Sequence, residues 1–400
     1  MGQAQEQPAT TDRLSIRSSN CSLDKVVVRW RDGHESRFPA IWLRHNCTCA
    51  ECGSTETGRR HLRLTDIPAD VRAQRATVDQ DGNLEVSWAP EGHRSLYSPA
   101  WLRGNCLSAS EREYRRFKPP IWHPEVNDLV RYESLPSLQD KQNQLRYLER
   151  LRDYGFVVLT DVPAESGATE TAAATVGLLR ITNYGVYELI SRPNPQLAGD
   201  TSVALAPHTD EPYRQHPPGI TFFHVLVQSD EGGDSILIDG LHVAETLRSE
   251  DPEAFRLLSS VPVDFHRVLA EGRIFRASAP IIRLDQSGNV SGLRLLDRGT
   301  APFDLAENEV DSYYRAYRKL LSILYDKRNC LVVKILPGQV LVFNNQRLLH
   351  GRTAFDGSKS LRHVRTANVD LDEFYSSLRV LYREFGREEL YMRLPQGAGT

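Results

Sequence analysis

Two histidines and one aspartate in the second half of the chain have the residue types of an iron site. His208 and Asp210 are two positions apart in a segment of extended character, so both side chains point to the same side of the backbone. His350 follows much later in the chain. Two histidines and one carboxylate form the facial triad of non-haem Fe(II) oxygenases, which leaves coordination positions for a bidentate cosubstrate and O2. The first pair alone indicates little, because His123 and Glu125 show the same spacing.

An arginine after the distal histidine could bind a carboxylate of such a cosubstrate. Arg362 lies twelve residues beyond His350, and a planar guanidinium binds a carboxylate through two parallel hydrogen bonds. Arg352 and Arg365 could take its place, and a surface ion pair is the plain structural explanation for Arg362. Taken together, these residue types favour a non-haem iron oxygenase with a carboxylate-bearing cosubstrate.

Short strands must position these residues, because strand-like runs dominate the chain from residue 203 onward. Turns that contain Gly and Pro separate the runs, which is typical of an antiparallel barrel or a double-sheet jelly roll with helices packed outside. Before them, residues 141–155 show helical periodicity that ends at Gly155, and residues 169–179 form a second expected helix. The expected strands are 219–228, 235–240, 279–285, 330–336, 339–345 and 361–370.

The N-terminal part of the chain contains an internal repeat with a period of 59 residues. Each copy has a strand-like run, a turn and the motif WLRxNC, so a duplicated β unit that forms one small sheet domain explains the pattern. Residues 1–22 are polar, and we expect a disordered tail there. A change in composition near residue 125 predicts a small domain over 23–125 and a larger one over 126–395. The identical pairs are Gly33/Gly92, His34/His93, Ser36/Ser95, Trp42/Trp101, Leu43/Leu102, Arg44/Arg103, Asn46/Asn105 and Cys47/Cys106.

The composition excludes several classes of protein. The 400 residues include 49 basic and 52 acidic side chains, so no charge excess favours nucleic acid or anionic lipid as a partner. No apolar run approaches the ~18 residues of a membrane span, and the N-terminus lacks the apolar core of a secretory signal. Dinucleotide and P-loop glycine motifs are absent from the sequence. We therefore expect a cytoplasmic protein that acts on a small molecule.

Eight motifs carry a resemblance to a known family, namely AIWLRHNCTCAEC, SPAWLRGNC, TNYG, HTD, HPPGITFFHVL, EGGDSILIDG, NNQRLLHGR and LRHVRTANVD. With them the sequence resembles the Fe(II)- and 2-oxoglutarate-dependent dioxygenases of the TauD/TfdA superfamily, and within it γ-butyrobetaine hydroxylase and trimethyllysine hydroxylase. The resemblance covers residues 25 to 385. It implies a mainly β catalytic domain with helices, a double-stranded β-helix that binds Fe(II) through His208, Asp210 and His350. It also implies 2-oxoglutarate held by Arg362 with help from Ser235.

The reaction that this resemblance implies is the hydroxylation of an unactivated C–H bond. O2 cleaves 2-oxoglutarate to succinate and CO2 in the same turnover, and ascorbate serves as the reductant in vitro. Desaturation, ring closure and demethylation are possible from the same chemistry, whereas Asp210 argues against a halogenase, which needs that coordination position for halide. The resemblance also implies a homodimer. The alternative of another class is a zinc-dependent interaction module with an inactive barrel.

Three of the six cysteines lie within six residues, which indicates a metal site rather than disulfides. The resemblance implies that Cys47, Cys49 and Cys52 hold a structural zinc in the N-terminal domain, with His93 as the fourth ligand. Three reduced thiols without a metal are the plain alternative. The other residues eligible for the fourth position are His34, which the repeat relates to His93, Cys106 and His61.

The substrate pocket is where the sequence departs from the family pattern. γ-Butyrobetaine hydroxylase surrounds the trimethylammonium group with aromatic side chains, and Tyr184 keeps one of these positions. Acidic and amide residues at the others favour a cation that donates hydrogen bonds, such as an amine or a guanidinium. The alternative substrate is γ-butyrobetaine or trimethyllysine, in carnitine biosynthesis. The replacing residues are Glu188, Asp200, Glu211 and Asn368, and the arginines with which the acids could instead pair are Arg180, Arg192 and Arg214.

Overall fold

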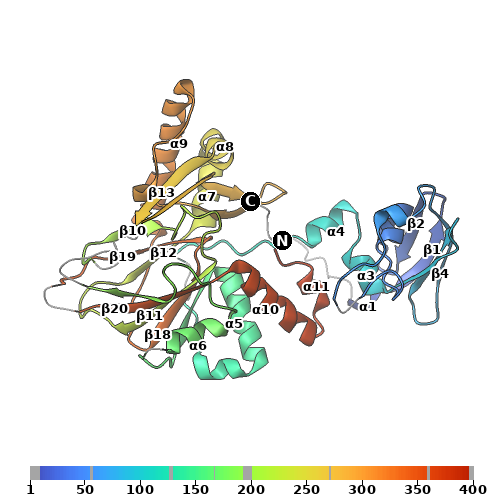
Figure 1. Cartoon of the computed structure of the whole chain (residues 1–400), viewed down its shortest axis with the longest axis horizontal. Coiled ribbons are helices and arrows are strands. Elements are labelled where there is room, and N and C mark those ends of the chain that lie inside the picture. The colour runs from blue at the N-terminus through green and yellow to red at the C-terminus, as the bar shows by residue number, and fades with distance from the viewer. Residues whose placement is uncertain are drawn as a thin grey trace, which may run out of the picture. The chain divides into compact units, whose positions relative to one another are not determined.

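The chain folds into two units that each contain their own sheets (Figure 1). The computed structural model describes residues 10–54, 57–125, 129–165, 167–191, 201–269, 272–357 and 361–395. Unit 1 contains the chain up to Phe117 together with Arg387–Pro395, and unit 2 contains Lys118–Gly386. Sequence composition places the boundary near residue 125 and does not indicate the return of the C-terminal segment. This segment packs through tertiary contacts, such as Arg393 over the ring of Tyr114 at 4.9 Å.

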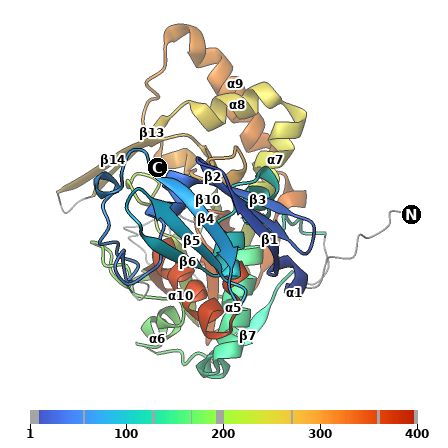
Figure 2. The ribbon, with the colours of Figure 1, turned by 90° about the vertical axis from the view of Figure 1, so that its right-hand side faces the viewer.

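Unit 1 is built from the two copies of the sequence repeat (Figure 2). Each copy supplies one three-stranded antiparallel sheet that leads directly into a short helix. The first copy contains β1 (Ile16–Cys21), β2 (Lys25–Trp30), β3 (Glu35–Pro39) and α2 (Ala40–His45). The second copy contains β4 (Arg72–Val78), β5 (Leu84–Ala89), β6 (Arg94–Tyr97) and α3 (Pro99–Gly104). The other elements of unit 1 are α1 (Thr10–Arg13), η1 (Leu64–Asp66), α4 (Ala109–Tyr114) and α11 (Glu388–Tyr391).

The two copies bury matching side chains in one core. Trp30 of β2 and Trp88 of β5 are almost fully buried, and each indole nitrogen donates a hydrogen bond to a buried serine. The acceptors are Ser36 Oγ at 2.8 Å and Ser95 Oγ at 2.9 Å. A buried indole N–H needs such a partner, so the repeated serines explain how each tryptophan can be buried.

Strand β1 lies within the stretch for which the sequence predicts a disordered tail, so that prediction is wrong from Ile16 to Cys21. The strand is polar and partly exposed, and it is held by antiparallel backbone pairing with β2. Edge strands of this kind carry no apolar alternation from which a sequence pattern could identify them. Residues 1–9 of the predicted tail lie outside the described residues.

Unit 2 is a sandwich of two sheets, which confirms the predicted strand-rich, double-sheet fold (Figure 1). The larger sheet has the strand order β7-β8-β18-β11-β20-β9, and the smaller has the order β10-β19-β12-β17. Apolar side chains of both sheets meet in one core, as Phe343 of β18 and Leu237 of β12 illustrate. The strands are β7 (Tyr132–Ser134), β8 (Phe156–Thr160), β9 (Tyr187–Ile190), β10 (Leu205–His208), β11 (Ile220–Val227), β12 (Ser235–Asp239), β17 (Leu331–Val333), β18 (Gln339–Asn344), β19 (Leu348–Arg352) and β20 (His363–Val369).

Helices and two hairpins cover this sandwich. Helices α5 and α6 pack on strands of the larger sheet, and α7, α8 and α9 share a second core with the hairpins and with β12 and β19 (Figure 1). The helices are η2 (Leu135–Gln139), α5 (Lys141–Tyr154), α6 (Ala168–Ala174), α7 (Gly240–Glu250), α8 (Pro252–Ser260), η4 (Asp297–Gly299), α9 (Glu307–Leu324), η5 (Lys327–Asn329) and α10 (Leu371–Glu384). The hairpins are β13 (Val263–Leu269) with β14 (Arg273–Ala279), and β15 (Ile282–Leu284) with β16 (Val290–Leu293).

Two sequence predictions about the helices can be compared with this structure. Helix α5 ends at Gly155, which has a φ of 81°, so the predicted glycine terminus is confirmed. The helix predicted over 169–179 is longer than the observed helix α6, which ends at Ala174.

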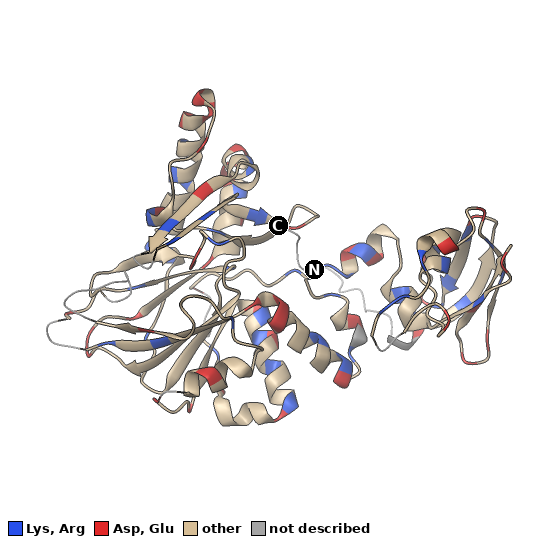
Figure 3. Cartoon of the chain, in the orientation of Figure 1, with Lys and Arg blue, Asp and Glu red and all other residues tan. Residues whose placement is uncertain are grey.

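None of the described helices combines the length and the apolarity needed to cross a membrane. Acidic and basic side chains are interspersed along both units, in agreement with the small net charge (Figure 3).

Candidate active site and thiolate cluster

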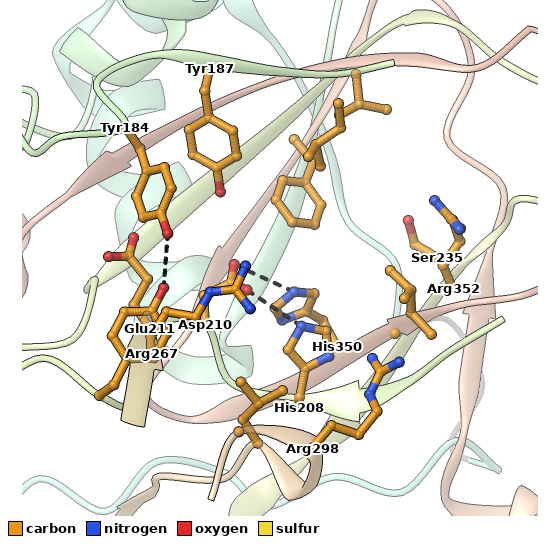
Figure 4. Close-up of a pocket in the computed structure, with 18 of the residues that line it drawn as sticks. Tyr184, Tyr187, His208, Asp210, Glu211, Ser235, Arg267, Arg298, His350 and Arg352 are labelled. Atoms are coloured by element: carbon orange, nitrogen blue, oxygen red, sulfur yellow. Dashed lines mark hydrogen bonds and ion pairs between the residues drawn. The ribbon is translucent and has the colours of Figure 1, made fainter. Parts of the chain in front are cut away.

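The pairing of β10 with β19 brings the predicted iron residues together (Figure 4). His208 and His350 are direct partners across the two strands, and their ring centroids are 4.5 Å apart. Asp210 follows β10, and its two carboxylate oxygens lie 3.4 Å from His208 Nε2 and 3.5 Å from His350 Nε2. Three donor atoms within 4.8 Å of one another form a group that could hold one metal ion.

Hydrogen bonds from neighbouring groups orient His208 and the backbone of Asp210. The Nδ1 atom of His208 lies 2.8 Å from the carbonyl oxygen of Ala206, and donation to that oxygen leaves Nε2 free to bind a metal. Asn345 is fully buried, and its amide oxygen accepts a 2.7 Å hydrogen bond from the backbone N–H of Asp210. His208 and the segment of Asp210 are therefore held in place by the protein itself.

Burial and charge set the protonation of the group in a direction that suits a cation. Burial lowers the pKa of His350 to about 4, so its imidazole is neutral at physiological pH. For Asp210, burial acts to raise the pKa, but the two histidines beside it outweigh burial and the net shift is downward. Two imidazoles and one carboxylate match the donor set that non-haem Fe(II) enzymes use.

Ser235 and Arg352 lie at one end of the cavity that contains the triad (Figure 4), and Arg362 lines the same cavity. Ser235 of β12 pairs with Arg352 of β19, and Arg362 precedes β20. Arg362 is only 6% exposed, which excludes the surface ion pair considered from the sequence. Burial, with a contribution from the nearby Arg352, lowers the pKa of Arg362 to about 10, so its guanidinium remains charged at neutral pH.

The contacts of the three candidate arginines separate them. Arg352 donates hydrogen bonds to the carbonyl oxygens of Thr201 and Val203, the latter at 2.8 Å. Arg365 forms an ion pair with Glu170 at 2.5 Å and does not belong to the described lining of the cavity. Arg362 forms no ion pair with any described carboxylate, so its fork is available to a ligand.

The cavity has a volume of about 350 Å³ and extends from these arginines past the triad to a group of tyrosines. Of the predicted substrate residues, Tyr184 and Glu211 line it. Sequence reasoning missed Tyr187 and Tyr213, although each lies three residues after a residue that it had singled out. The further lining residues that it missed are Leu189, Leu205, Phe223, His266, Arg267, Leu296, Arg298, Gly299, Gly351 and Val364.

The other predicted substrate residues are not part of this lining. Glu188 points to the cross-strand neighbour Arg365 at 3.6 Å and to His363 at 3.4 Å, so its prediction as a pocket residue is wrong. Asn368 is buried and accepts a 2.8 Å hydrogen bond from Thr221 Oγ1, and it is not among the described lining residues either. Asp200 lies outside the described residues.

Glu211 lines the cavity but is already paired. Its carboxylate forms an ion pair with Arg214, three residues further along the chain. Burial raises the pKa of Glu211, although Arg214 acts in the opposite direction. The carboxylate that the sequence assigns to a substrate cation is therefore occupied by a cation of the protein.

A second donor group lies in unit 1 and consists of Cys47, Cys49, Cys52 and His93. The three sulfur atoms lie 3.4, 3.6 and 3.5 Å from His93 Nε2, in that order. A tetrahedral zinc with Zn–S of about 2.3 Å and Zn–N of about 2.0 Å separates sulfur and nitrogen by about 3.5 Å, so the group fits zinc. Burial raises the pKa of the Cys52 thiol to about 12, and a bound cation would displace that proton.

The repeat places a second, corresponding cluster in unit 1, here called the mirror cluster. In it, His34 Nε2 lies 3.4 Å from Cys106 Sγ. Ser108 stands where the first cluster has Cys49, and Glu111 stands where it has Cys52. Glu111 accepts hydrogen bonds from Arg103 at 3.1 Å and from Arg13 at 2.6 Å. Ion pairs of Glu111 with two arginines therefore hold the mirror cluster together. Neither His34 nor Cys106 belongs to the thiolate group. His61, the remaining candidate, is exposed and also lies outside that group.

Comparisons with known proteins cover both units. The family described as Taurine catabolism dioxygenase TauD, TfdA family matches residues 114–367, and the one described as Gamma-butyrobetaine hydroxylase-like, N-terminal matches residues 20–82. Gamma-butyrobetaine dioxygenase of Pseudomonas sp. (strain AK-1) is 37% identical over 90% of this chain and 94% of that protein. Gamma-butyrobetaine dioxygenase of Homo sapiens is 30% identical over 89% and 94%, respectively. Trimethyllysine dioxygenase of Meyerozyma guilliermondii is 30% identical over 90% and 94%.

Proposed function

The chain belongs to the TauD, TfdA family and is a 2-oxoglutarate-dependent dioxygenase, and on that premise we propose that His208, Asp210 and His350 hold its Fe(II). The observation that carries the proposal is the strand register that brings two imidazoles and one carboxylate within 4.8 Å inside a cavity. Such a group occupies one face of the metal and leaves the opposite face for exchangeable ligands. When bound, the iron with 2-oxoglutarate and O2 supplies the oxidation of a C–H bond, with release of succinate and CO2.

We place the distal carboxylate of 2-oxoglutarate at Arg362, with Ser235 beside it. Both side chains line the cavity, and both are less than a tenth exposed. A charge-assisted, bidentate pair is strongest in such a buried position, because little water competes for the guanidinium. Arg352 instead orders the backbone at Thr201 and Val203 through its guanidinium.

The other lining residues position the substrate and exclude water. Phe223 packs edge-on against the ring of His350 at 5.3 Å and makes the wall of the cavity apolar beside the metal donors. Tyr184 and Tyr213 share a hydroxyl–hydroxyl contact of 3.2 Å, and Tyr184 lies at the opposite end of the cavity from Ser235 (Figure 4). A substrate between these two ends presents its C–H bond to the triad.

The sequence predicts a substrate with an amine or a guanidinium, but the structure gives little reason for one. Glu188 and Asn368 are not among the described lining residues, and Glu211 is paired with Arg214. We therefore limit the proposal to the hydroxylation of a small molecule. γ-Butyrobetaine or trimethyllysine is the second candidate, because the relatives with 30–37% identity are named for these two compounds. We also propose that the protein is a homodimer located in the cytoplasm.

We also propose that Cys47, Cys49, Cys52 and His93 hold a structural Zn2+. Four protein donors complete a tetrahedral shell, and such closed sites stabilise a fold rather than bind a substrate. The support is the agreement between the sulfur–nitrogen separations and those of a zinc tetrahedron.

Release of succinate from 2-oxoglutarate tests the oxygenase function. The full-length protein with Fe(II), ascorbate and 2-oxoglutarate is incubated with betaines, unmethylated amines, guanidines and simple carboxylic acids. We expect at least one class to raise succinate release about tenfold above the rate without substrate, and Arg362→Gln to abolish the increase. If the protein neither binds 2-oxoglutarate nor consumes it with any class, the interaction-module alternative is correct.

A further inference from the structure

We propose that the substrate is a small organic acid without a cationic head group, and that Arg267 and Arg298 bind its anionic group. This substrate class presupposes the oxygenase function proposed above and concerns the part of the cavity not used by Arg362. Relatives named for γ-butyrobetaine and trimethyllysine favour a cation in this place. Two independent sets of contacts in this chain favour an anion.

The first set concerns Arg214, which contacts two lining residues, Glu211 and Tyr184, that could otherwise attract a cation. Its guanidinium forms an ion pair with Glu211 and a hydrogen bond with the side-chain oxygen of Asn183. The same guanidinium lies 4.4 Å from the ring centroid of Phe275 and 5.7 Å from that of Tyr184. A carboxylate, an amide oxygen and aromatic faces are the features that recognise an ammonium or guanidinium ligand. Here the protein supplies its own guanidinium to them.

The second set concerns two arginines that line the cavity without an ion-pair partner among the described residues (Figure 4). Arg267 lies on β13, and Arg298 lies in η4. A bridge between Phe265 and Thr300, together with a 2.8 Å backbone hydrogen bond from Ala301 to Asp264, attaches this segment to β13. Both guanidiniums therefore face one cavity from connected parts of the chain.

The balance of charge along the cavity follows from these contacts. Asp210 belongs to the metal group, Glu211 and Arg214 neutralise each other, and Arg362 is assigned to 2-oxoglutarate. Arg352 also lines the cavity, where it donates hydrogen bonds to the carbonyl oxygens of Thr201 and Val203. Arg267 and Arg298 are the remaining positive charges, and no described lining carboxylate opposes them. An ammonium ligand would enter this field against repulsion, whereas a carboxylate would be attracted and would gain a charge-assisted hydrogen bond from a guanidinium that it reaches. The plain alternative is that the two arginines are simply solvated, since Arg298 is exposed.

Direct binding measurements distinguish these alternatives. Hexanoate, hexanamide and hexylamine share one carbon chain and differ in the charge of the head group. We expect isothermal titration of the anaerobic, Fe(II)-loaded full-length protein with saturating 2-oxoglutarate to show hexanoate binding at least about tenfold more tightly than the other two. We expect the double variant Arg267→Gln/Arg298→Gln to lose this preference. Arg273→Gln removes a charge from β14 outside the described lining and serves as the matched control, with the preference retained.

The role of Arg214 has its own test. Replacing both members of its ion pair, as in Glu211→Gln/Arg214→Met, leaves no uncompensated buried charge and frees the rings of Tyr184 and Phe275. We expect γ-butyrobetaine to bind this double variant at least about tenfold more tightly than it binds the wild type. Unchanged binding of γ-butyrobetaine would show that Arg214 does not fill a cation site.

Several outcomes would overturn the assignment. Tighter binding of hexylamine or γ-butyrobetaine than of hexanoate by the wild type would do so, and so would equal binding of the three six-carbon probes or no hexanoate binding at millimolar concentration. Binding of 2-oxoglutarate alone is titrated first. Its absence contradicts the oxygenase function, whereas normal 2-oxoglutarate binding with a preference for a cation contradicts only the proposed substrate class.

Discussion

The two donor groups of this chain differ in how many ligands the protein supplies. The triad contributes two donors from paired strands and one from the residue two positions after β10, and it lies in a cavity of about 350 Å³. The thiolate group contributes four donors and closes its own shell. An incomplete shell leaves room for reactants, whereas a complete one can only hold chain segments together. The number of donors, more than the surrounding fold, separates the proposed catalytic site from the proposed structural one.

The largest expected effect comes from removing a donor of the triad, here called the open site because its donor set is incomplete. Asp210→Ala removes one of three protein donors, and we expect succinate release to fall to about 1% of the wild-type rate or less. The melting temperature should stay within a few degrees, because the side chain belongs to a cavity rather than to the core. Near-normal turnover in this variant, without added carboxylate, would contradict the assignment of the triad.

Removing a donor of the thiolate group, here called the closed site, should lower stability strongly and affect the active site little. Cys49→Ser removes one thiolate, so we expect the variant to lose its zinc and unit 1 to lose several kcal/mol of stability. Metal analysis of protein purified without chelators should find about one Zn per wild-type chain and much less in the variant. The affinity for 2-oxoglutarate should change far less than the stability. Absence of zinc from the wild type would refute the closed site.

The mirror cluster provides a matched pair that sharpens this comparison. His93→Ala should release zinc, whereas His34→Ala should retain it, because His34 contacts Cys106 rather than the thiolate group. We expect His34→Ala to lower the free energy of unfolding by only about 1–2 kcal/mol, from the lost hydrogen bond and packing. Equal zinc loss in both variants, measured by metal analysis, would show that the two histidines are interchangeable.

The smallest expected effect defines the edge of the open site. Glu188 points to Arg365 and His363, so Glu188→Gln should change the KM of any identified substrate less than about twofold. The conservative Asp297→Asn, outside the described lining of the main cavity, serves as the control. Steady-state kinetics that show a large rise in KM for Glu188→Gln would return Glu188 to the pocket.

Local spacing predicted the parts of the structure that depend on periodicity. The two-residue spacing of His208 and Asp210 indicated donors on one side of an extended segment, and the structure brings both next to His350. Gly155 marked the end of a helix for an equally local reason. Residues brought to the cavity by tertiary packing left no such signal, which is why Arg267 and Arg298 were missed.

The wrong predictions have a common physical cause. Whether an acidic side chain faces a ligand or an arginine depends on which residue lies across the sheet or a few positions along the chain. Glu188 pairs with Arg365 across β9 and β20, and Glu211 pairs with Arg214 three residues later. The repeat related His34 to His93 correctly, but it could not show that an ion pair at Glu111 closes the mirror cluster.

The register of β10 and β19 also limits how this enzyme can diverge. Side chains alternate along a strand, so an insertion or deletion of one residue within either segment would turn a histidine to the opposite face. At Gly351 the strands leave no room for a side chain, because a Cβ there would lie 2.6 Å from the carbonyl oxygen of Leu205. Length changes are therefore expected to accumulate in the loops between Asp210 and β19, while the two short strands keep a fixed length throughout the evolution of active descendants.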